Sequence, residues 1–131
     1  MSSFRNLKAY IKAKELVKQV YDQIKKFPRE EQFALCDQLR RSVISVPSNI
    51  AEGLGRSTDK DKGHFMQIAY SSLMETMAQL DIACDIGYIS DEEFNAGWRL
   101  ACVSTVCADV TVLVPDIASA FKSRMKVADL S

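Results

Sequence analysis

The sequence predicts an all-α protein, folded as an antiparallel up-and-down four-helix bundle. Three observations support this fold class: apolar residues recur at spacings of three and four, proline and glycine divide the chain into four segments, and two segments begin with helix-capping sequences. On folding, a globular chain of this length buries roughly 65–70% of the surface that it exposes when unfolded. Residues 1–131 are therefore expected to form a single bundle domain that needs no disulfide or metal to fold.

The first two helices are expected at residues 4–27 and 28–54. Pro28 ends the first, because the residue before a proline is disfavoured in the helical conformation. Pro28 also suits the first position of the second helix, where Glu30 and Glu31 lie favourably at the positive end of the helix dipole.

Pro47 lies inside the second predicted helix, where a proline costs about 3 kcal/mol and usually breaks the run. The apolar stripe nevertheless keeps its phase across the proline, which a true break has no reason to preserve. The stripe comprises Cys36, Leu39, Val43, Val46, Ile50 and Leu54. We therefore expect one helix, kinked at Pro47 and ending at Gly53–Gly55.

The third and fourth helices are expected at residues 59–87 and 91–124. The segment 58–61 offers a capping-box-like start for the third helix, and Gly87 suits its end. Residues 90–93, with serine and glutamate three apart, form a stronger capping box for the fourth helix.

The last segment is less regular than the others. Residues 103–114 are rich in β-branched side chains, so a short strand is an alternative, although no other strand is predicted to pair with it. From Leu100 to Val114 the segment is apolar nearly all round, so either a partner subunit or a larger intramolecular core covers its outer side. Pro115 is expected to kink or end this helix.

Seventeen basic residues balance seventeen acidic ones, but their distribution is uneven. Residues 1–62 hold thirteen Lys and Arg against eight Asp and Glu, whereas residues 63–131 hold four against nine. The basic half faces phosphate in one interpretation. In the other, which is the more usual arrangement in bundles, the two halves neutralise each other across helix contacts.

The sequence shows no sign of a cofactor site. The cysteines form no C-x-x-C pair and His64 is the only histidine, so buried free thiols in a reducing, cytoplasmic compartment are expected, with no metal or other cofactor. No secretion leader is recognised, and the most apolar stretch, about 15 residues, is shorter than the ~20 that a membrane span needs.

A polar stripe runs along the second predicted helix. Its members recur at spacings of three and four, so they share one face, which the helical wheel places opposite the apolar stripe. The polar stripe comprises Gln38, Arg41, Ser45, Asn49, Glu52 and Arg56. Exposed helix surface usually favours Lys and Glu, whereas this stripe mixes amides, a hydroxyl and arginines.

Three interpretations of the polar stripe remain open. It is solvated surface, or a subunit interface in which Arg41 or Arg56 pairs with Glu52 or Glu75 of a neighbouring copy. In the third, Arg41 and Arg56 bind nucleic-acid phosphates, although Glu52 in the middle of the stripe argues against phosphate.

The same region resembles the four-helix-bundle family of 23S-rRNA intervening-sequence proteins. The main resemblance is the run QLRRSVISVPSNIAEG at residues 38–53. Supporting matches follow in order at residues 4–7 (FRNL), 27–31 (FPREE), 68–75 (IAYSSLME) and 87–89 (GYI). Beyond Phe94 the resemblance fades.

The resemblance implies an antiparallel bundle that assembles into a ring-like homo-oligomer, pentameric in known members, with no settled biochemical role. A related branch, the accessory proteins of diversity-generating retroelements, is basic and binds nucleic acid, an activity that transfers poorly to this neutral chain. Carried over by position, the polar signature residues are Gln38, Arg41, Asn49, Glu52 and Glu75.

Catalysis is not expected. No Glu-x-x-His pair and no glycine-rich phosphate loop occurs, and no nucleophile stands beside a base. The leading hypothesis is a cytoplasmic, homo-oligomeric interaction or scaffold protein, associated with ribosomal RNA or ribonucleoprotein, with no membrane partner and no small-molecule substrate. The alternative is a nucleic-acid-binding accessory protein that uses the basic residues of the first two helices.

Overall fold

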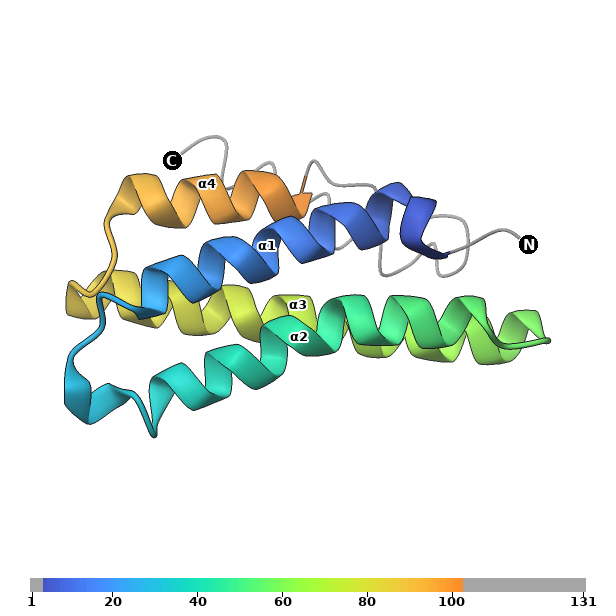
Figure 1. Cartoon of the computed structure of the whole chain (residues 1–131), viewed down its shortest axis with the longest axis horizontal. Coiled ribbons are helices and arrows are strands. Elements are labelled where there is room, and N and C mark those ends of the chain that lie inside the picture. The colour runs from blue at the N-terminus through green and yellow to red at the C-terminus, as the bar shows by residue number, and fades with distance from the viewer. Residues whose placement is uncertain (1–3, 103–131) are drawn as a thin grey trace.

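Four helices pack side by side along one long axis in the computed structural model, which describes residues 4–102 (Figure 1). They are α1 (Lys8–Ile24), α2 (Leu35–Leu54), α3 (Asp59–Ile86) and α4 (Asp91–Cys102), with short 3-10 helices η1 (Phe4–Asn6) and η2 (Arg29–Glu31). No strand occurs within residues 4–102. The predicted four-helix bundle is therefore confirmed, while residues 103–124 of the fourth predicted helix, Pro115 included, lie outside the described part.

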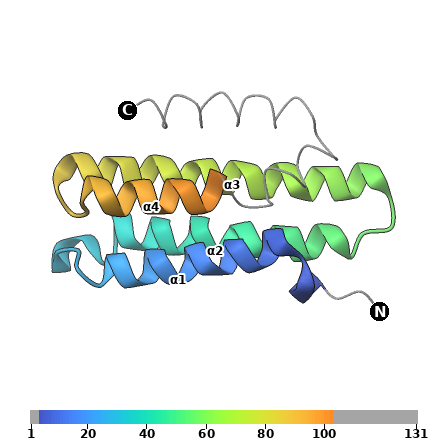
Figure 2. The ribbon, with the colours of Figure 1, turned by 90° about the horizontal axis from the view of Figure 1, so that it is seen from above.

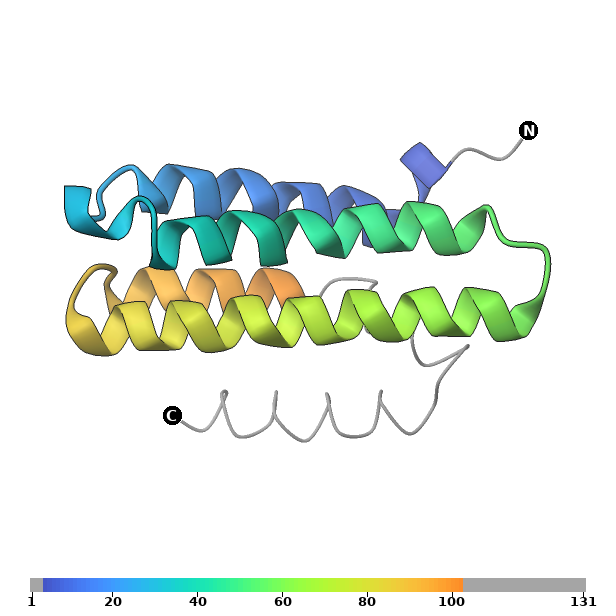
Figure 3. The ribbon, with the colours of Figure 1, turned by 90° about the horizontal axis from the view of Figure 1, so that it is seen from below.

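The helices form two layers. The chain reverses direction at each connection, so that α1 contacts α2 and α4, and α3 contacts the same two helices. The helices α1 and α4 face the viewer in Figure 2, and α2 and α3 face the viewer from the opposite side in Figure 3. The α2–α3 pair makes the most extensive contact.

One apolar core lies between the two layers. Every helix contributes to it, because each presents apolar residues at helical spacing on its inner side. The largest fully buried side chains include Leu16, Leu39, Val43, Leu73, Met77 and Leu80. Each such side chain contributes roughly 1.5–3 kcal/mol relative to exposure, which is why these four segments stay together.

The predicted caps of α3 and α4 are present. Thr58 Oγ1 accepts a hydrogen bond from the Asp61 backbone N–H at 3.1 Å. The Ser90 hydroxyl and the Glu93 carboxylate each accept from the other residue's backbone N–H, both at 3.1 Å, as a capping box requires. Gly87 ends α3 with a φ of 98°, a left-handed conformation that suits glycine.

The helix α2 runs without interruption through Pro47, which is buried. The prediction of one helix across the proline is confirmed, and a kink at Pro47 stays a prediction. The helix ends at Leu54, as expected from the glycines that follow, but Leu54 itself is exposed rather than part of the core.

The predicted start of the second helix at Pro28 is wrong. The helix α2 begins at Leu35, and residues 29–31 form the short helix η2 instead. Similarly, α1 occupies only residues 8–24 of the predicted 4–27, because Leu7 is extended and separates it from η1.

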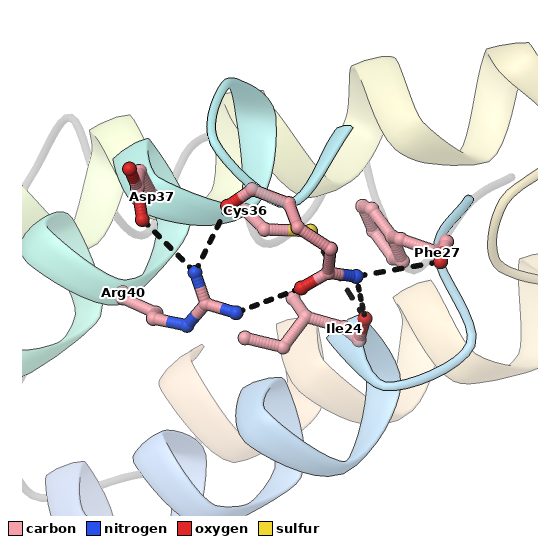
Figure 4. Close-up of polar contacts among 6 residues, drawn as sticks. Ile24, Phe27, Cys36, Asp37 and Arg40 are labelled. Atoms are coloured by element: carbon pink, nitrogen blue, oxygen red, sulfur yellow. Dashed lines mark hydrogen bonds and ion pairs between the residues drawn. The ribbon is translucent and has the colours of Figure 1, made fainter. Parts of the chain in front are cut away.

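Gln32, directly after η2, and side chains from α2 stabilise this turn (Figure 4). Gln32 Nε2 donates to the backbone carbonyl of Ile24 at 3.1 Å, so it satisfies one of the orphan acceptors at the end of α1. Arg40 donates from Nη2 to Gln32 Oε1 at 2.8 Å and from Nη1 to Asp37 at 3.0 Å. A turn fixed by such tertiary contacts replaces the first turns of the predicted helix.

Candidate interaction surface on α2 and α3

The polar stripe lies beside α3 rather than opposite the core, which corrects the prediction from the helical wheel. Ser42 and Gly53 are buried together with the apolar residues of α2. The buried surface of α2 therefore extends further toward α3 than the apolar stripe predicts. The polar stripe begins at the edge of this buried surface. The hydroxyl oxygens of Ser45 and Ser72 consequently lie only 2.7 Å apart, across the two helices.

A chain of buried polar groups connects α2 to α3. Thr76 donates to Ser42 Oγ at 2.8 Å, Ser42 lies 3.0 Å from Gln79 Oε1, and Gln79 Nε2 lies 3.4 Å from Gln38 Oε1. Thr76, Ser42 and Gln79 are buried. Hydrogen bonds that are complete in a low-dielectric environment favour one alignment of the two helices over its neighbours.

Sequence reasoning missed most of this polar chain. Ser72, Thr76 and Gln79 recur at spacings of four and three, so they share one side of α3, but they lie next to the apolar residues that dominate its buried side. Their partner Ser42 stands one residue beyond Arg41 of the stripe. Matching small polar residues on two consecutive helices was the signal available.

An open cleft of about 320 Å³ lies over this polar chain. Its lining is polar or charged throughout: Gln38, Arg41, Ser42, Ser45, Ser72 and Glu75. A neighbouring surface hollow, of about 550 Å³, shares Ser72 and Glu75 and continues along α3 to His64. The structure thus brings Gln38, Arg41, Ser45 and Glu75 of the predicted site together.

Arg41 and Glu75 are exposed, and neither forms an ion pair or side-chain hydrogen bond within residues 4–102. An arginine and a carboxylate that line one cleft without pairing leave both charges free for another molecule. The open cleft therefore exposes hydrogen-bond donors and acceptors above the buried polar chain between α2 and α3.

The carboxyl-terminal part of the stripe is different. Arg56, just beyond the end of α2, pairs with Glu52 of that helix at 2.5 Å, and its guanidinium lies 4.5 Å from the ring centre of Phe65. Asn49 Nδ2 donates to the backbone carbonyl and the hydroxyl of Ser45, at 2.8 and 2.9 Å. These three side chains are satisfied within the chain.

The charge-biased halves of the sequence meet at one ion pair among the described residues, Lys26–Glu93 at 2.6 Å. The other ion pairs within residues 4–102 join residues three or four apart. Mutual neutralisation of the two halves is therefore limited in this part of the chain.

The thiols of Cys36 and Cys84 are not activated. Burial raises the pKa of the Cys36 thiol. A hydrogen bond to Asp91 at 3.0 Å is the main reason that the pKa of Cys84 rises to about 11. Both thiols are protonated at neutral pH, so neither offers a thiolate nucleophile. Within residues 4–102 no group of three or more His, Cys, Asp or Glu is placed to hold a metal ion.

A family model described as 23S rRNA-intervening sequence protein matches residues 5–101. The chain belongs to the 23S rRNA-intervening sequence protein family. No curated protein matches the sequence. The family model includes all the candidate site residues, from Gln38 to Glu75, and nearly all of the described bundle.

Membership confirms the resemblance inferred from the residues of α2. The description of the 23S rRNA-intervening sequence protein family refers to a ribosomal RNA and names no enzymatic reaction. Within residues 4–102, no helix is both long and apolar enough to cross a membrane.

Proposed function

We propose that this member of the 23S rRNA-intervening sequence protein family is a non-catalytic, cytoplasmic interaction or scaffold protein that assembles with copies of itself through the open cleft between α2 and α3. The observation that carries the proposal is the unpaired state of Arg41 and Glu75, which line one cleft. Two copies that meet at this surface bring Arg41 of one copy to Glu75 of the next. Such charge-assisted pairs fix the register of an interface.

The geometry of such a contact determines the assembly. If Arg41 of each copy meets Glu75 of the following copy in one rotational direction, the contact is head-to-tail, and it forms a ring when the rotation between copies closes. The ring of five copies implied by the family resemblance is the form that we propose. The same pairing around a two-fold axis gives a dimer instead, so the measured mass distinguishes the two.

Exposed apolar side chains on the same two helices support an interface. Ile82 and Ile86, one turn apart on α3, are 50% and 55% exposed, and Ile44 on α2 is 43% exposed. Burial of apolar area supplies most of the affinity of a typical interface, whereas charged groups supply its specificity. Polar and apolar contacts of this kind are what a self-associating surface requires.

Size-exclusion chromatography with light scattering tests this proposal on the full chain. The protein is expected to elute as an oligomer of its 14.7 kDa subunit. Arg41→Glu places two carboxylates opposite each other and weakens assembly at least about tenfold, the effect of losing one charge-assisted contact. Lys18→Glu, a charge reversal at an exposed position of α1, is the matched control and leaves the mass unchanged.

A wild-type monomer at tens of micromolar would contradict the proposal. Equal dissociation by Lys18→Glu and Arg41→Glu would also contradict it, because the effect would then arise from net charge rather than from the cleft.

A second candidate function is binding of structured RNA by α1. The observation that favours it is a set of exposed lysines on this helix, with Lys8 and Lys18 unpaired among the described residues. Affinity for a structured RNA that falls steeply between low and physiological salt, and falls further in Lys18→Glu, supports this candidate. Absence of binding at low salt excludes it. Because Lys18→Glu is expected to leave assembly intact, this variant separates the two functions.

A further inference from the structure

Phe33, in the turn between η2 and α2, is the most exposed large apolar side chain among residues 4–102. It is 91% exposed, so almost none of its ring is covered within the subunit. Single exposed apolar residues are common on protein surfaces, and exposure alone identifies no partner. The partner follows from how the turn holds Phe33 and from where it places the ring along the bundle.

The backbone beside Phe33 is held in place. The side-chain amide of Gln32, the preceding residue, donates to the backbone carbonyls of Ile24 at 3.1 Å and Phe27 at 3.4 Å. Arg40 donates to the backbone carbonyl of Gln32 at 3.1 Å and to its Oε1 at 2.8 Å. Phe33 is therefore presented on an ordered turn, which lowers the entropy that a binding partner must remove.

The antiparallel pairing of α2 and α3 gives Phe33 a defined height along the bundle. Ser45 Oγ lies 2.7 Å from Ser72 Oγ, and Gln79 Nε2 lies 3.4 Å from Gln38 Oε1. Seven residues toward the start of α2 thus correspond to seven residues toward the end of α3. Phe33 is five residues beyond Gln38 in the same direction, so it lies level with the last turns of α3. Figure 3 shows η2 and the end of α3 at the same end of the bundle.

The last turns of α3 carry two exposed isoleucines, Ile82 and Ile86. They are three and seven residues beyond Gln79, so the height of Phe33 falls between them. Ile82 follows Glu75 by seven residues and Ile86 follows Ile82 by four, so the three side chains share one face of α3. Because Glu75 lines the open cleft, this apolar pair continues the surface of the cleft toward the end of the bundle.

The spacing from Arg41 to Phe33 matches the spacing along α3. Phe33 lies eight residues before Arg41, and Ile82 and Ile86 lie seven and eleven residues after Glu75. At a rise of about 1.5 Å per residue, these separations are about 12 Å on one helix and about 10 to 17 Å on the other, in the same direction. When Arg41 of one copy meets Glu75 of a parallel copy, Phe33 therefore reaches the isoleucines of that copy.

Antiparallel copies, related by a two-fold axis across the bundle, would give Phe33 a different partner. The direction of α3 is then reversed, and Gln67, eight residues before Glu75, lies at the height of Phe33. Gln67 and Ile68 line the hollow of about 550 Å³ on α3, in which Ile68 is the only apolar lining residue. Because an apolar ring gains more from two exposed isoleucines than from a mainly polar hollow, the parallel arrangement is favoured.

We propose that Phe33 is the apolar anchor of the assembly and packs against Ile82 and Ile86 of the next copy, with the copies parallel. The inference rests on the proposed assembly through Arg41 and Glu75, and it adds the apolar contact that a charged pair lacks. Parallel copies are also what a ring around an axis along the bundles requires. The anchor supplies affinity, and the charged pair supplies register.

Sedimentation equilibrium of the full chain tests the anchor through the concentration at which half of the assembly dissociates. Phe33→Ala is expected to raise this concentration at least about tenfold, because a large apolar contact is lost. Ile11→Ala, which shortens an exposed isoleucine of α1, is the matched control and is expected to leave it unchanged. Urea denaturation of the dissociated subunit is expected to be the same for Phe33→Ala and the wild type, because Phe33 is uncovered in the subunit.

A double-mutant cycle identifies the partner of Phe33. If Phe33 packs against Ile82, combining Phe33→Ala with Ile82→Ala costs less affinity than the product of the two single losses. Combining Phe33→Ala with Ile68→Ala is expected to give the full product, because those residues do not meet in parallel copies.

The outcomes separate the anchor from the proposed function. If Arg41→Glu dissociates the assembly while Phe33→Ala assembles like the wild type, the anchor is wrong and the charged contact stands. A wild type that stays monomeric would contradict the proposed function, and the anchor with it. Coupling of Phe33 to Ile68 instead of Ile82 would overturn the parallel arrangement. A loss of subunit stability in Phe33→Ala, with unchanged assembly, would show that another part of the same chain covers the ring.

Discussion

The α2–α3 contact and the α1–α4 contact both bury polar side chains between helices, but only the first satisfies them within the described chain. Between α2 and α3, Thr76, Ser42 and Gln79 form a connected set of hydrogen bonds. Between α1 and α4, Gln19 and Gln23 each keep an unpaired amide oxygen. Satisfied polar groups align two helices, whereas unsatisfied ones contribute nothing to the alignment.

The two contacts also differ in closeness. A Cβ added at Gly53 would lie 3.0 Å from Phe65 Cβ, so α2 and α3 touch almost backbone to side chain at that point. At Gly97 in α4 the nearest atom to an added Cβ is 3.7 Å away, which is ordinary contact distance. At these two points the α2–α3 contact is therefore the closer one.

The largest effect is expected for Gly53→Ala. The added methyl group would lie 3.0 Å from Phe65 Cβ and 3.2 Å from Met66 Cε, so Phe65 must move by a few tenths of an ångström. Overpacking of this kind costs about 1–3 kcal/mol of unfolding free energy. Urea denaturation measures the change. Gly97→Ala is the control, and a comparable loss in that variant would show that the two contacts are equally close.

A smaller difference is expected between Thr76→Val and Gln23→Leu, which both remove a buried polar group. Thr76→Val breaks the complete set of hydrogen bonds and is expected to lower the unfolding free energy by about 1–2 kcal/mol. Gln23→Leu removes an acceptor that is already unpaired and only a long, 3.5 Å contact from Nε2 to the Glu93 carbonyl, so a change smaller than about 1 kcal/mol of either sign is expected. Equal losses in urea denaturation would contradict the comparison between the two contacts.

Residues that act locally were predictable from sequence, and residues that act across the bundle were not. The caps at Thr58 and Ser90 involve partners three residues away, so their spacing alone indicated them. The turn between α1 and α2 depends on the contact between Arg40 and Gln32, which lie in separate elements. The sequence pattern predicted a continuous helix from residue 28 and gave no sign of this turn.

The candidate site was likewise predictable in its local pattern but not in its contacts with other helices. Periodicity and the family resemblance located the stripe from Gln38 to Arg56, but its orientation was wrong because only apolar residues defined the expected buried face. Ser42, a small polar residue, is buried like an apolar one because its hydroxyl forms hydrogen bonds with Thr76 and Gln79 of α3. Whether a small polar residue is buried depends on its hydrogen-bond partners on another helix. The residue pattern of one helix does not show those partners.

Acid is expected to weaken the α1–α4 contact before it affects the α2–α3 polar chain. A hydrogen bond from Lys26, with help from the Ser90 backbone, holds the pKa of Glu93 below its ordinary value. A lowered carboxyl pKa contributes stability that is complete above the ordinary pKa and is lost as pH falls through the folded-state pKa. Unfolding free energies measured downward from about pH 6 should therefore fall less in Lys26→Met than in the wild type.

An identical pH dependence in Lys26→Met would contradict this assignment. The polar chain between α2 and α3 contains only hydroxyl and amide groups, so Thr76→Val is expected to leave the pH dependence itself unchanged.

The smallest effect on subunit stability is expected at the satisfied end of the stripe. Glu52 and Arg56 form an exposed pair one helical turn apart, and such pairs contribute little. Glu52→Gln is expected to change the unfolding free energy by less than about 0.5 kcal/mol. A loss of several kcal/mol, with dissociation of the assembly, would place Glu52 in the interface beside Arg41.

The central claim, that Arg41 of one copy meets Glu75 of another, is tested most directly by exchanging the two charges. Sedimentation velocity is compared for the wild type, Arg41→Glu, Glu75→Arg and the double variant. We expect each single variant to dissociate and the double variant, in which the opposite charges again face each other, to recover the wild-type mass. A double variant that stays dissociated, or single variants that keep the wild-type mass, would contradict the account.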